Sequence, residues 1–187
     1  IEHLAGLRSI PNLNVFRPCD AIETFESWEI AINSFNNPSV LALSRQNLPL
    51  LRKKIKNNLV SRGGYLLRKN EKSKLTLIAS GSEVSIGLDL YEKLKQNGVF
   101  SNLVSMPCLE IFEKQQEQYK RKILGTKFKV VIEAASSHGW HKFLNSNDLV
   151  FGIDEFGESG KGHDLYEHFS LTKDKIYKKI INQFFKW

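Results

Sequence analysis

Short apolar runs alternate with segments of helical period along most of this chain, and that alternation limits the fold more than any other feature. The runs at residues 39–43 and 75–79 are nearly continuous, which favours parallel strands buried on both faces. Between such runs lie segments whose apolar residues recur every three or four positions, as in helices packed by one face. Strands that alternate with helices predict an α/β fold of mostly parallel sheets covered by helices.

The first such unit is a strand, helix and strand at residues 12–44. After a short extended run, Asp20 is placed to cap a helix, and Glu23 follows three residues later as in a capping box. The sequence Asn-Asn-Pro at residues 36–38 ends that helix. Its expected apolar face consists of Ile22, Phe25, Trp28, Ile32 and Phe35.

A larger series of units follows a polar, basic stretch at residues 50–62, which we interpret as a linker. Two amphipathic segments end the chain. Further strands are expected at residues 75–79, 99–106, 129–134 and 149–153, and helices at 81–97 and 109–124. The last segment is expected to carry Ile176, Ile180, Ile181, Phe184 and Phe185 on one face.

Composition excludes several classes of protein. No apolar run approaches the roughly 20 residues that span a bilayer, so we expect no membrane partner. The chain has 27 Lys and Arg against 20 Asp and Glu, but its lysines are scattered, so we expect no nucleic-acid partner. Cys19 and Cys108 lie far apart, which favours free thiols over a zinc or redox site. Because Met106 is the only methionine, we expect a processed product or a piece of a longer protein.

Three clusters could carry chemistry, but each has a favoured structural interpretation. The turn at residues 79–83 could hold an anion at a helix N-terminus, yet it lacks phosphate-loop glycine spacing, so a plain helix cap is favoured. His138 and His141 have no third metal ligand at a fitting distance. Glu155 and Glu158 share one loop instead of facing each other across a cleft, which favours surface carboxylates over an acid–base pair.

Residues 44–47, Ser-Arg-Gln-Asn, form the strongest candidate site. They directly follow a buried parallel strand, and open α/β sheets present their ligand contacts at the carboxyl ends of strands. The guanidinium of Arg45 suits a phosphate or carboxylate, and Gln46 and Asn47 add polar groups. The alternative is an arginine paired with an acidic neighbour, and spacing alone does not decide between the two.

Residues 43–49, Leu-Ser-Arg-Gln-Asn-Leu-Pro, resemble the motif near the end of the pyrimidine-binding domain of transketolases. One departure is Gly-Lys-Gly-His at residues 160–163, where the family usually has Ala-Pro, and we expect a more flexible and basic loop there. Further segments resemble the family in order and spacing over the whole chain: residues 1–8, 16–20, 63–65, 79–84, 104–108, 139–142 and 156–159.

The resemblance implies three parts. Residues 1–55 would be the end of an incomplete pyrimidine-binding domain, residues 56–62 a linker, and residues 63–187 a Rossmann-like C-terminal domain that serves packing and subunit association. Arg45 matches the arginine that contacts the sugar phosphate, and it is the only substrate residue that carries over. Asp20 and Arg17 are interpreted as cap and scaffold.

The resemblance also implies an activity for the complete enzyme. It would be a cytoplasmic homodimeric transferase of the pentose phosphate pathway, moving a two-carbon ketol unit from a ketose phosphate to an aldose phosphate. Thiamine diphosphate and a divalent cation, Mg or Ca, would be its cofactors. The family's catalytic, cofactor and metal residues precede the position matched by Ile1, so this chain alone is expected to bind no cofactor and to be inactive.

Two alternatives remain open. A stand-alone Rossmann-like binding or assembly module without catalysis would fold self-sufficiently. A piece of a transketolase would instead expose an apolar face on residues 1–44, because that unit has lost the rest of its sheet. A relative such as a deoxyxylulose phosphate synthase or a ketoacid dehydrogenase β-subunit fits the motif at residues 44–49 less well. The preferred sugar phosphates do not follow from the sequence.

Overall fold

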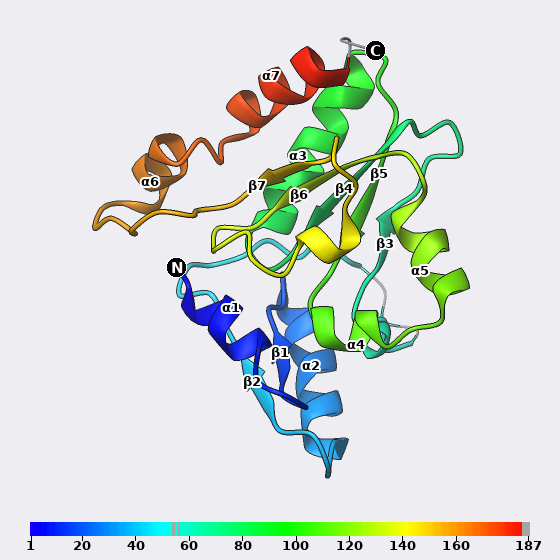
Figure 1. The fold of residues 1–187 in the computed structure, drawn as a ribbon, viewed down its shortest axis with the longest axis vertical. Coiled ribbons are helices and arrows are strands. Elements are labelled where there is room, and N and C mark those ends of the chain that lie inside the picture. The colour runs from blue at the N-terminus through cyan, green and yellow to red at the C-terminus, as the bar shows by residue number, and fades with distance from the viewer. Residues whose placement is uncertain (54, 56, 185–187) are drawn as a thin grey trace.

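The computed structural model describes residues 1–53, 55 and 57–184, and these form two sheets flanked by helices (Figure 1). The smaller sheet has two parallel strands joined by a helix, as predicted for residues 12–44, but its second strand is half-buried and not buried as expected, because no further strand covers it in the described chain. Its elements, with the helix that precedes them, are α1 (His3–Arg8), β1 (Asn14–Phe16), α2 (Ala21–Asn33) and β2 (Ser39–Leu41).

The larger sheet contains five strands in the order β3-β5-β4-β6-β7 within the described residues. Its strands are β3 (Tyr65–Arg68), β4 (Leu75–Ala79), β5 (Ser101–Ser105), β6 (Phe128–Ile132) and β7 (Leu149–Phe151). All neighbours pair in parallel except β3, which is antiparallel to β5. The strands expected from the sequence correspond to β4 to β7, whereas β3 is too short to display a period of its own. The predicted α/β class with mostly parallel sheets is confirmed.

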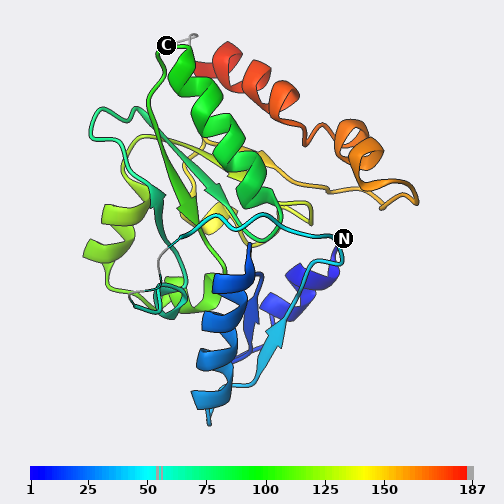
Figure 2. The same cartoon turned by 180° about the vertical axis from the view of Figure 1, so that it is seen from behind.

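Helices cover both faces of the larger sheet (Figures 1 and 2). One face packs against α3 (Glu83–Gln96) and α7 (Lys173–Phe184), and the other against α4 (Leu109–Glu113) and α5 (Glu117–Leu124). The single helix expected at residues 109–124 is therefore two short helices. The remaining elements are η1 (Val60–Arg62), η2 (His141–Phe143) and α6 (Gly162–His168). None of the helices in the described part of the chain is long and apolar enough to cross a membrane.

The stretch expected to be a linker lies against α2. The backbone N–H groups of Leu51 and Arg52 donate to Asp20 Oδ2 over 3.0 and 3.3 Å. Further along, Glu26 Oε2 accepts from the N–H of Val60 at 3.2 Å, and Val60 is fully buried. These contacts fasten the stretch to the helix. Three predicted positions lie outside the described residues: Lys54 and Lys56 of this stretch and Phe185 of the last helix.

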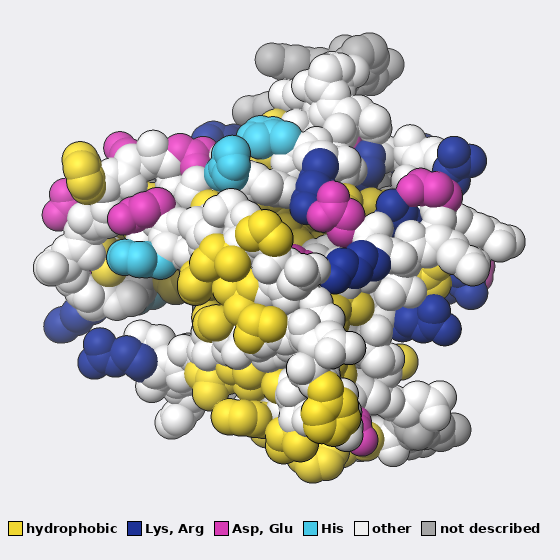
Figure 3. Space-filling model, turned by 60° about the horizontal axis from the view of Figure 1, so that its bottom comes forward, with side chains coloured by type: hydrophobic (Ala, Val, Ile, Leu, Met, Phe, Trp, Pro, Cys, Tyr) yellow, Lys and Arg dark blue, Asp and Glu magenta, His cyan; other side chains and the backbone are white. Residues whose placement is uncertain are grey.

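The outward face of α2 remains exposed. Of the predicted apolar stripe only Ile22 is buried, at 8% exposure. The others are exposed to these fractions: Phe25 62%, Trp28 50%, Ile32 69% and Phe35 93%. The helix ends at Asn33, earlier than predicted, so Phe35 lies just beyond it. Hydrophobic side chains gather on the face that comes forward in Figure 3, at the end of the molecule built by residues 1–44. The exposed apolar face predicted for an incomplete strand–helix–strand unit is thus confirmed.

Candidate functional site

Arg45 lies in the loop that follows β2, at the carboxyl end of that strand, and its side chain is exposed. Within the described part of the chain, the Arg45 side chain makes no hydrogen bond or ion pair. The structure therefore does not contain the alternative arrangement, in which Arg45 pairs with an acidic neighbour. All donors of its guanidinium therefore face solvent and remain available to an anion.

The neighbours of Arg45 line a cleft. Ser44 Oγ donates to Gln46 Oε1 over 3.2 Å, which gives the loop a small internal turn. Gln46 and Asn47 border a cavity of about 740 Å³ that Tyr166 of α6 also lines. Arg45 itself is not among the residues that line it. The loop therefore offers polar groups to the cleft and the arginine to solvent beside it.

A buried carboxylate, Glu133, lies beneath the turn that connects β1 to α2. It accepts from Arg8 Nη1 and Nη2 at 2.7 and 2.8 Å, from Ser80 Oγ at 2.6 Å and from Trp140 Nε1 at 2.6 Å. Burial by itself would raise the pKa of Glu133. The hydrogen bonds and charge of Arg8, the charge of Arg17 and the Ser80 hydroxyl outweigh burial and lower the pKa to about 2.

Arg17 extends this network to a second carboxylate. Its Nη1 pairs with Glu83, donates to Ser80 O at 3.0 Å and lies 3.6 Å from Glu133 Oε1. Glu83 is fully buried and also accepts from the Tyr166 hydroxyl and, at 2.9 Å, from the N–H of Ala134. Because Arg17 precedes α2 and Glu83 begins α3, the network joins the two sheets.

The network corrects the favoured interpretation of the turn at residues 79–83. Ser82 occupies the N-cap position but makes no side-chain cap hydrogen bond, and its Oγ donates instead to Glu83 Oε1 over 2.7 Å. The turn is therefore not a plain helix cap. Nor is it open to an anion, because the Glu83 carboxylate occupies it and binds the chain's own Arg17. One sequence signal could have indicated a buried charge network here: Glu133 directly follows the apolar run at the end of β6, and a carboxylate buried at such a position needs charged partners.

Asp20 and Glu23 behave nearly as the capping box predicts. Glu23 N donates to Asp20 Oδ1 over 2.9 Å, which confirms the cap. The Glu23 carboxylate binds the N–H of Cys19 at 2.7 Å instead of that of Asp20, and it also accepts from Ser105 and Tyr65 at 2.6 and 2.7 Å. Burial outweighs these three hydrogen bonds and raises the pKa of Glu23.

The remaining candidates are the two cysteines, the pair of histidines and the two loop glutamates. Cys19 and Cys108 are both free and buried, as expected, and burial raises the pKa of each thiol. His141 lies 3.5 Å from the hydroxyl of Ser137. Glu155 and Glu158 are both exposed in one loop, as the surface interpretation predicts.

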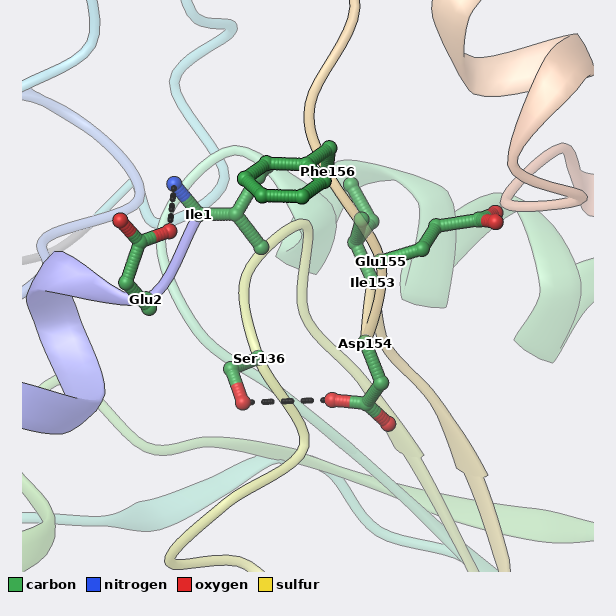
Figure 4. A pocket seen from close by; sticks show the side chains of 7 residues that line it. All are labelled: Ile1, Glu2, Ser136, Ile153, Asp154, Glu155 and Phe156. Carbon is green, nitrogen blue, oxygen red and sulfur yellow. Dashed lines mark hydrogen bonds and ion pairs between the residues drawn. The ribbon is translucent and has the colours of Figure 1, made fainter.

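A pocket of about 330 Å³ lies beside that loop, between Ile1 and Phe156. Figure 4 shows Glu155 pointing away from Ser136 and Asp154, whose side chains are hydrogen-bonded over 3.2 Å. Asp154 also accepts from the N–H of Ser137 at 2.7 Å, so the carboxylate at this side of the pocket is already hydrogen-bonded within the chain.

No group of three or more His, Cys, Asp or Glu side chains in residues 1–53, 55 and 57–184 is arranged to hold a metal ion. The turn before α3, where a parallel sheet commonly receives phosphates, is filled by Glu83 and Arg17.

Comparisons with known proteins agree on one family. Residues 1–50 match the model of the transketolase pyrimidine-binding domain, and residues 63–172 match that of the transketolase-like C-terminal domain. Transketolase of Sinorhizobium medicae is 47% identical over 184 residues, which are 97% of this chain and 26% of that protein.

Solved structures give the same result. Campylobacter jejuni transketolase superposes with a TM-score of 0.89 at 40% identity, covering 97% of this chain and 28% of that one. Pichia stipitis transketolase in complex with sedoheptulose 7-phosphate gives a TM-score of 0.90 at 35% identity, covering 98% of this chain and 27% of that one. The chain spans about a quarter of the length of the relatives it matches.

Proposed function

The chain belongs to the transketolase family, and we propose that it acts as the C-terminal part of an enzyme that transfers a two-carbon ketol unit from a ketose phosphate to an aldose phosphate. The observation that carries the proposal is the free guanidinium of Arg45 at the carboxyl end of β2. A phosphate with a charge near −2 forms charge-assisted hydrogen bonds with such a group, worth roughly 1.5 to 3 kcal/mol net each.

The exposed stripe of α2 supports the same proposal. Three large apolar side chains of α2, with Phe35 just beyond its end, are costly to leave in water, and monomeric proteins rarely expose such a patch without a partner for it. We infer that the rest of a pyrimidine-binding domain covers this stripe in the complete enzyme. A stand-alone binding or assembly module is a weaker candidate, because it offers no cover for the stripe.

The remaining parts of the proposal follow from the family. The complete enzyme would be a cytoplasmic homodimer of the pentose phosphate pathway, with thiamine diphosphate and a divalent cation held by regions outside this chain. Within the chain, residues 1–55 would complete the pyrimidine-binding domain, residues 56–62 would link, and residues 63–187 would form the C-terminal domain. No chemical step is assigned to residues of this chain, and Arg45 would bind and orient substrate.

Kinetics of the complete enzyme test the role of Arg45. In Arg45→Ala, we expect the KM for a phosphorylated ketose to rise by roughly tenfold to a hundredfold with little change in kcat, because a contact equal in ground and transition states affects binding alone. The KM for an unphosphorylated ketol donor should stay the same. Arg121→Ala, at another exposed arginine on α5, is the matched control and should change neither constant. Equal losses for both donors in Arg45→Ala would contradict the phosphate contact.

A further inference from the structure

One short turn, residues 16–20, holds both ends of the loop that carries Arg45. At the start of the loop, the N–H of Ala42 donates to the carbonyl at the end of β1 over 2.8 Å. At its end, the N–H groups of Leu51 and of the next residue donate to Asp20 Oδ2. Between these anchors, residues 43–50 make no other hydrogen bond to the rest of the described chain. The position of the loop thus depends on the turn.

Asp20 divides its carboxylate between two tasks. Oδ1 accepts from the N–H of Glu23 at 2.9 Å and caps α2, while Oδ2 accepts the two amides that end the loop. The side chain is only 3% exposed, so water does not readily replace either partner. One buried side chain therefore joins the start of the helix to the end of the loop.

The turn itself is fixed by the larger sheet. The N–H of Arg17 donates to Pro107 O at 2.8 Å, and its carbonyl accepts from the N–H of Gly81 at 2.9 Å. Its guanidinium is paired with Glu83 and lies near Glu133, both fully enclosed. The turn cannot move without breaking buried ion pairs, which is strongly unfavourable. A continuous path of contacts thus runs from the C-terminal domain to the loop.

We propose that Asp20 is a positioning residue for Arg45, and that the C-terminal domain, acting through Arg17, determines where the guanidinium meets the phosphate of the substrate. The inference rests on the proposed function of Arg45. A flexible arginine gains little from an anion unless its backbone is held in place, and small displacements of a binding group weaken binding steeply. The C-terminal domain would then contribute to substrate affinity without touching the substrate.

The variant Asp20→Ser separates the two tasks in the complete enzyme. Serine can still cap α2 through its hydroxyl, but it leaves the loop amides without their acceptor. We expect the KM for a phosphorylated ketose to rise by roughly fivefold to tenfold, with kcat and the KM for an unphosphorylated ketol donor unchanged. Hydrogen exchange should become faster at the Leu51 amide and stay slow at the Glu23 amide. Should the serine variant fold poorly, Asp20→Asn replaces it: asparagine keeps one acceptor oxygen, which can serve the cap or the loop amides but not both. The same rise in KM is expected if the Leu51 amide is the one that exchanges faster.

A neighbouring contact supplies the control. Thr24 Oγ1 donates to the backbone carbonyl of Asp20 over 2.8 Å, so Thr24→Val removes a side-chain bond in the same turn and leaves the loop amides paired. This variant should leave both KM values unchanged. A phosphate-specific loss in Arg45→Ala without one in either Asp20 variant would overturn the positioning role alone. No phosphate-specific loss in Arg45→Ala would overturn the proposed function itself.

Discussion

At the scale of single residues, the most consequential feature is a carboxylate that stays ionised although it is fully buried. Glu133 is held by two hydrogen bonds from Arg8, one from Ser80 and one from Trp140, and by the nearby charge of Arg17. Removing one member of such a set leaves a buried charge without a partner, which costs more than an exposed ion pair ever contributes.

The lowered pKa of Glu133 makes the free energy of unfolding depend on pH. Its pKa falls from 4.5 to about 2 on folding, so the folded state gains stability above the unfolded pKa and loses it as the pH drops towards the folded one. We expect about 3 kcal/mol to be lost between about pH 5 and pH 2. Denaturant unfolding across this range measures it.

The variant Glu133→Gln serves as the reference for that measurement, because it cannot titrate. Glu23, whose raised pKa favours the folded state in acid, is present in both proteins, so its opposite contribution cancels in the difference. The gap in unfolding free energy between the two proteins should shrink as the pH falls. Glu155→Gln, in an exposed loop, should track the unsubstituted chain at every pH. A gap independent of pH would contradict the assignment.

At the scale of elements, the turn between β4 and α3 is shaped around Arg17, a side chain from the segment that follows β1. Gly81 has a φ of +55°, and a Cβ there would lie 2.8 Å from Arg17 Cγ. Arg17 cannot easily move aside, since its guanidinium is paired with Glu83. This glycine is needed both for its backbone conformation and for the close approach of the arginine.

Two glycine substitutions separate these needs. Gly98 has a φ of +75°, and a Cβ at that position would have no neighbour within 4 Å, so Gly98→Ala should lower the free energy of unfolding by about 1 kcal/mol through backbone strain alone. Gly81→Ala adds the clash, and we expect about 2 to 4 kcal/mol. Thermal and denaturant unfolding of the two variants compare them directly. Equal losses of unfolding free energy in the two variants would mean that the Arg17 side chain moves aside at no cost.

Local signals explain which elements could be predicted. The cap at Asp20 and the apolar run of β4 lie within a few residues of sequence, and both predictions are confirmed. The edge strand β3 escapes prediction because four residues show no period and its partner β5 lies far along the chain. The contacts of Arg17 and Glu133 escape it for the same reason, since no spacing rule relates residues so distant.

At the scale of the whole molecule, the two ends differ in what they show to solvent. The larger sheet is covered on both faces, whereas α2 exposes an apolar stripe beside a two-stranded sheet. The candidate site can be found from the sequence because Arg45 comes shortly after an apolar run, but the contacts that hold its loop cannot, since Asp20 and Leu51 are 31 residues apart.

The exposed stripe predicts how this chain behaves by itself. We expect it to self-associate and to bind a hydrophobic dye, because large exposed apolar patches promote association. Replacing Phe25, Trp28, Ile32 and Phe35 together by Gln should abolish both while changing the unfolding free energy by only about 0.5 kcal/mol per site. Light scattering and dye fluorescence provide the measurement. Ile22→Gln, at the buried position of the same helix, should instead destabilise the fold. Unchanged association in the fourfold variant would mean that another surface of the chain causes the self-association.

The ion pair between Arg8 and Glu133 joins residues 125 positions apart, and this bears on how the chain acquires its structure during synthesis. Arg8 leaves the ribosome long before Glu133 is synthesised. Until then Arg8 and Arg17 stay hydrated, and the early strand–helix–strand segment cannot form its buried ion pairs. Contacts so distant in sequence slow folding and lengthen the time for which apolar surface is open to wrong partners. The nascent segment is therefore where a chaperone would have the most time to bind before Glu133 appears and the buried ion pair can form.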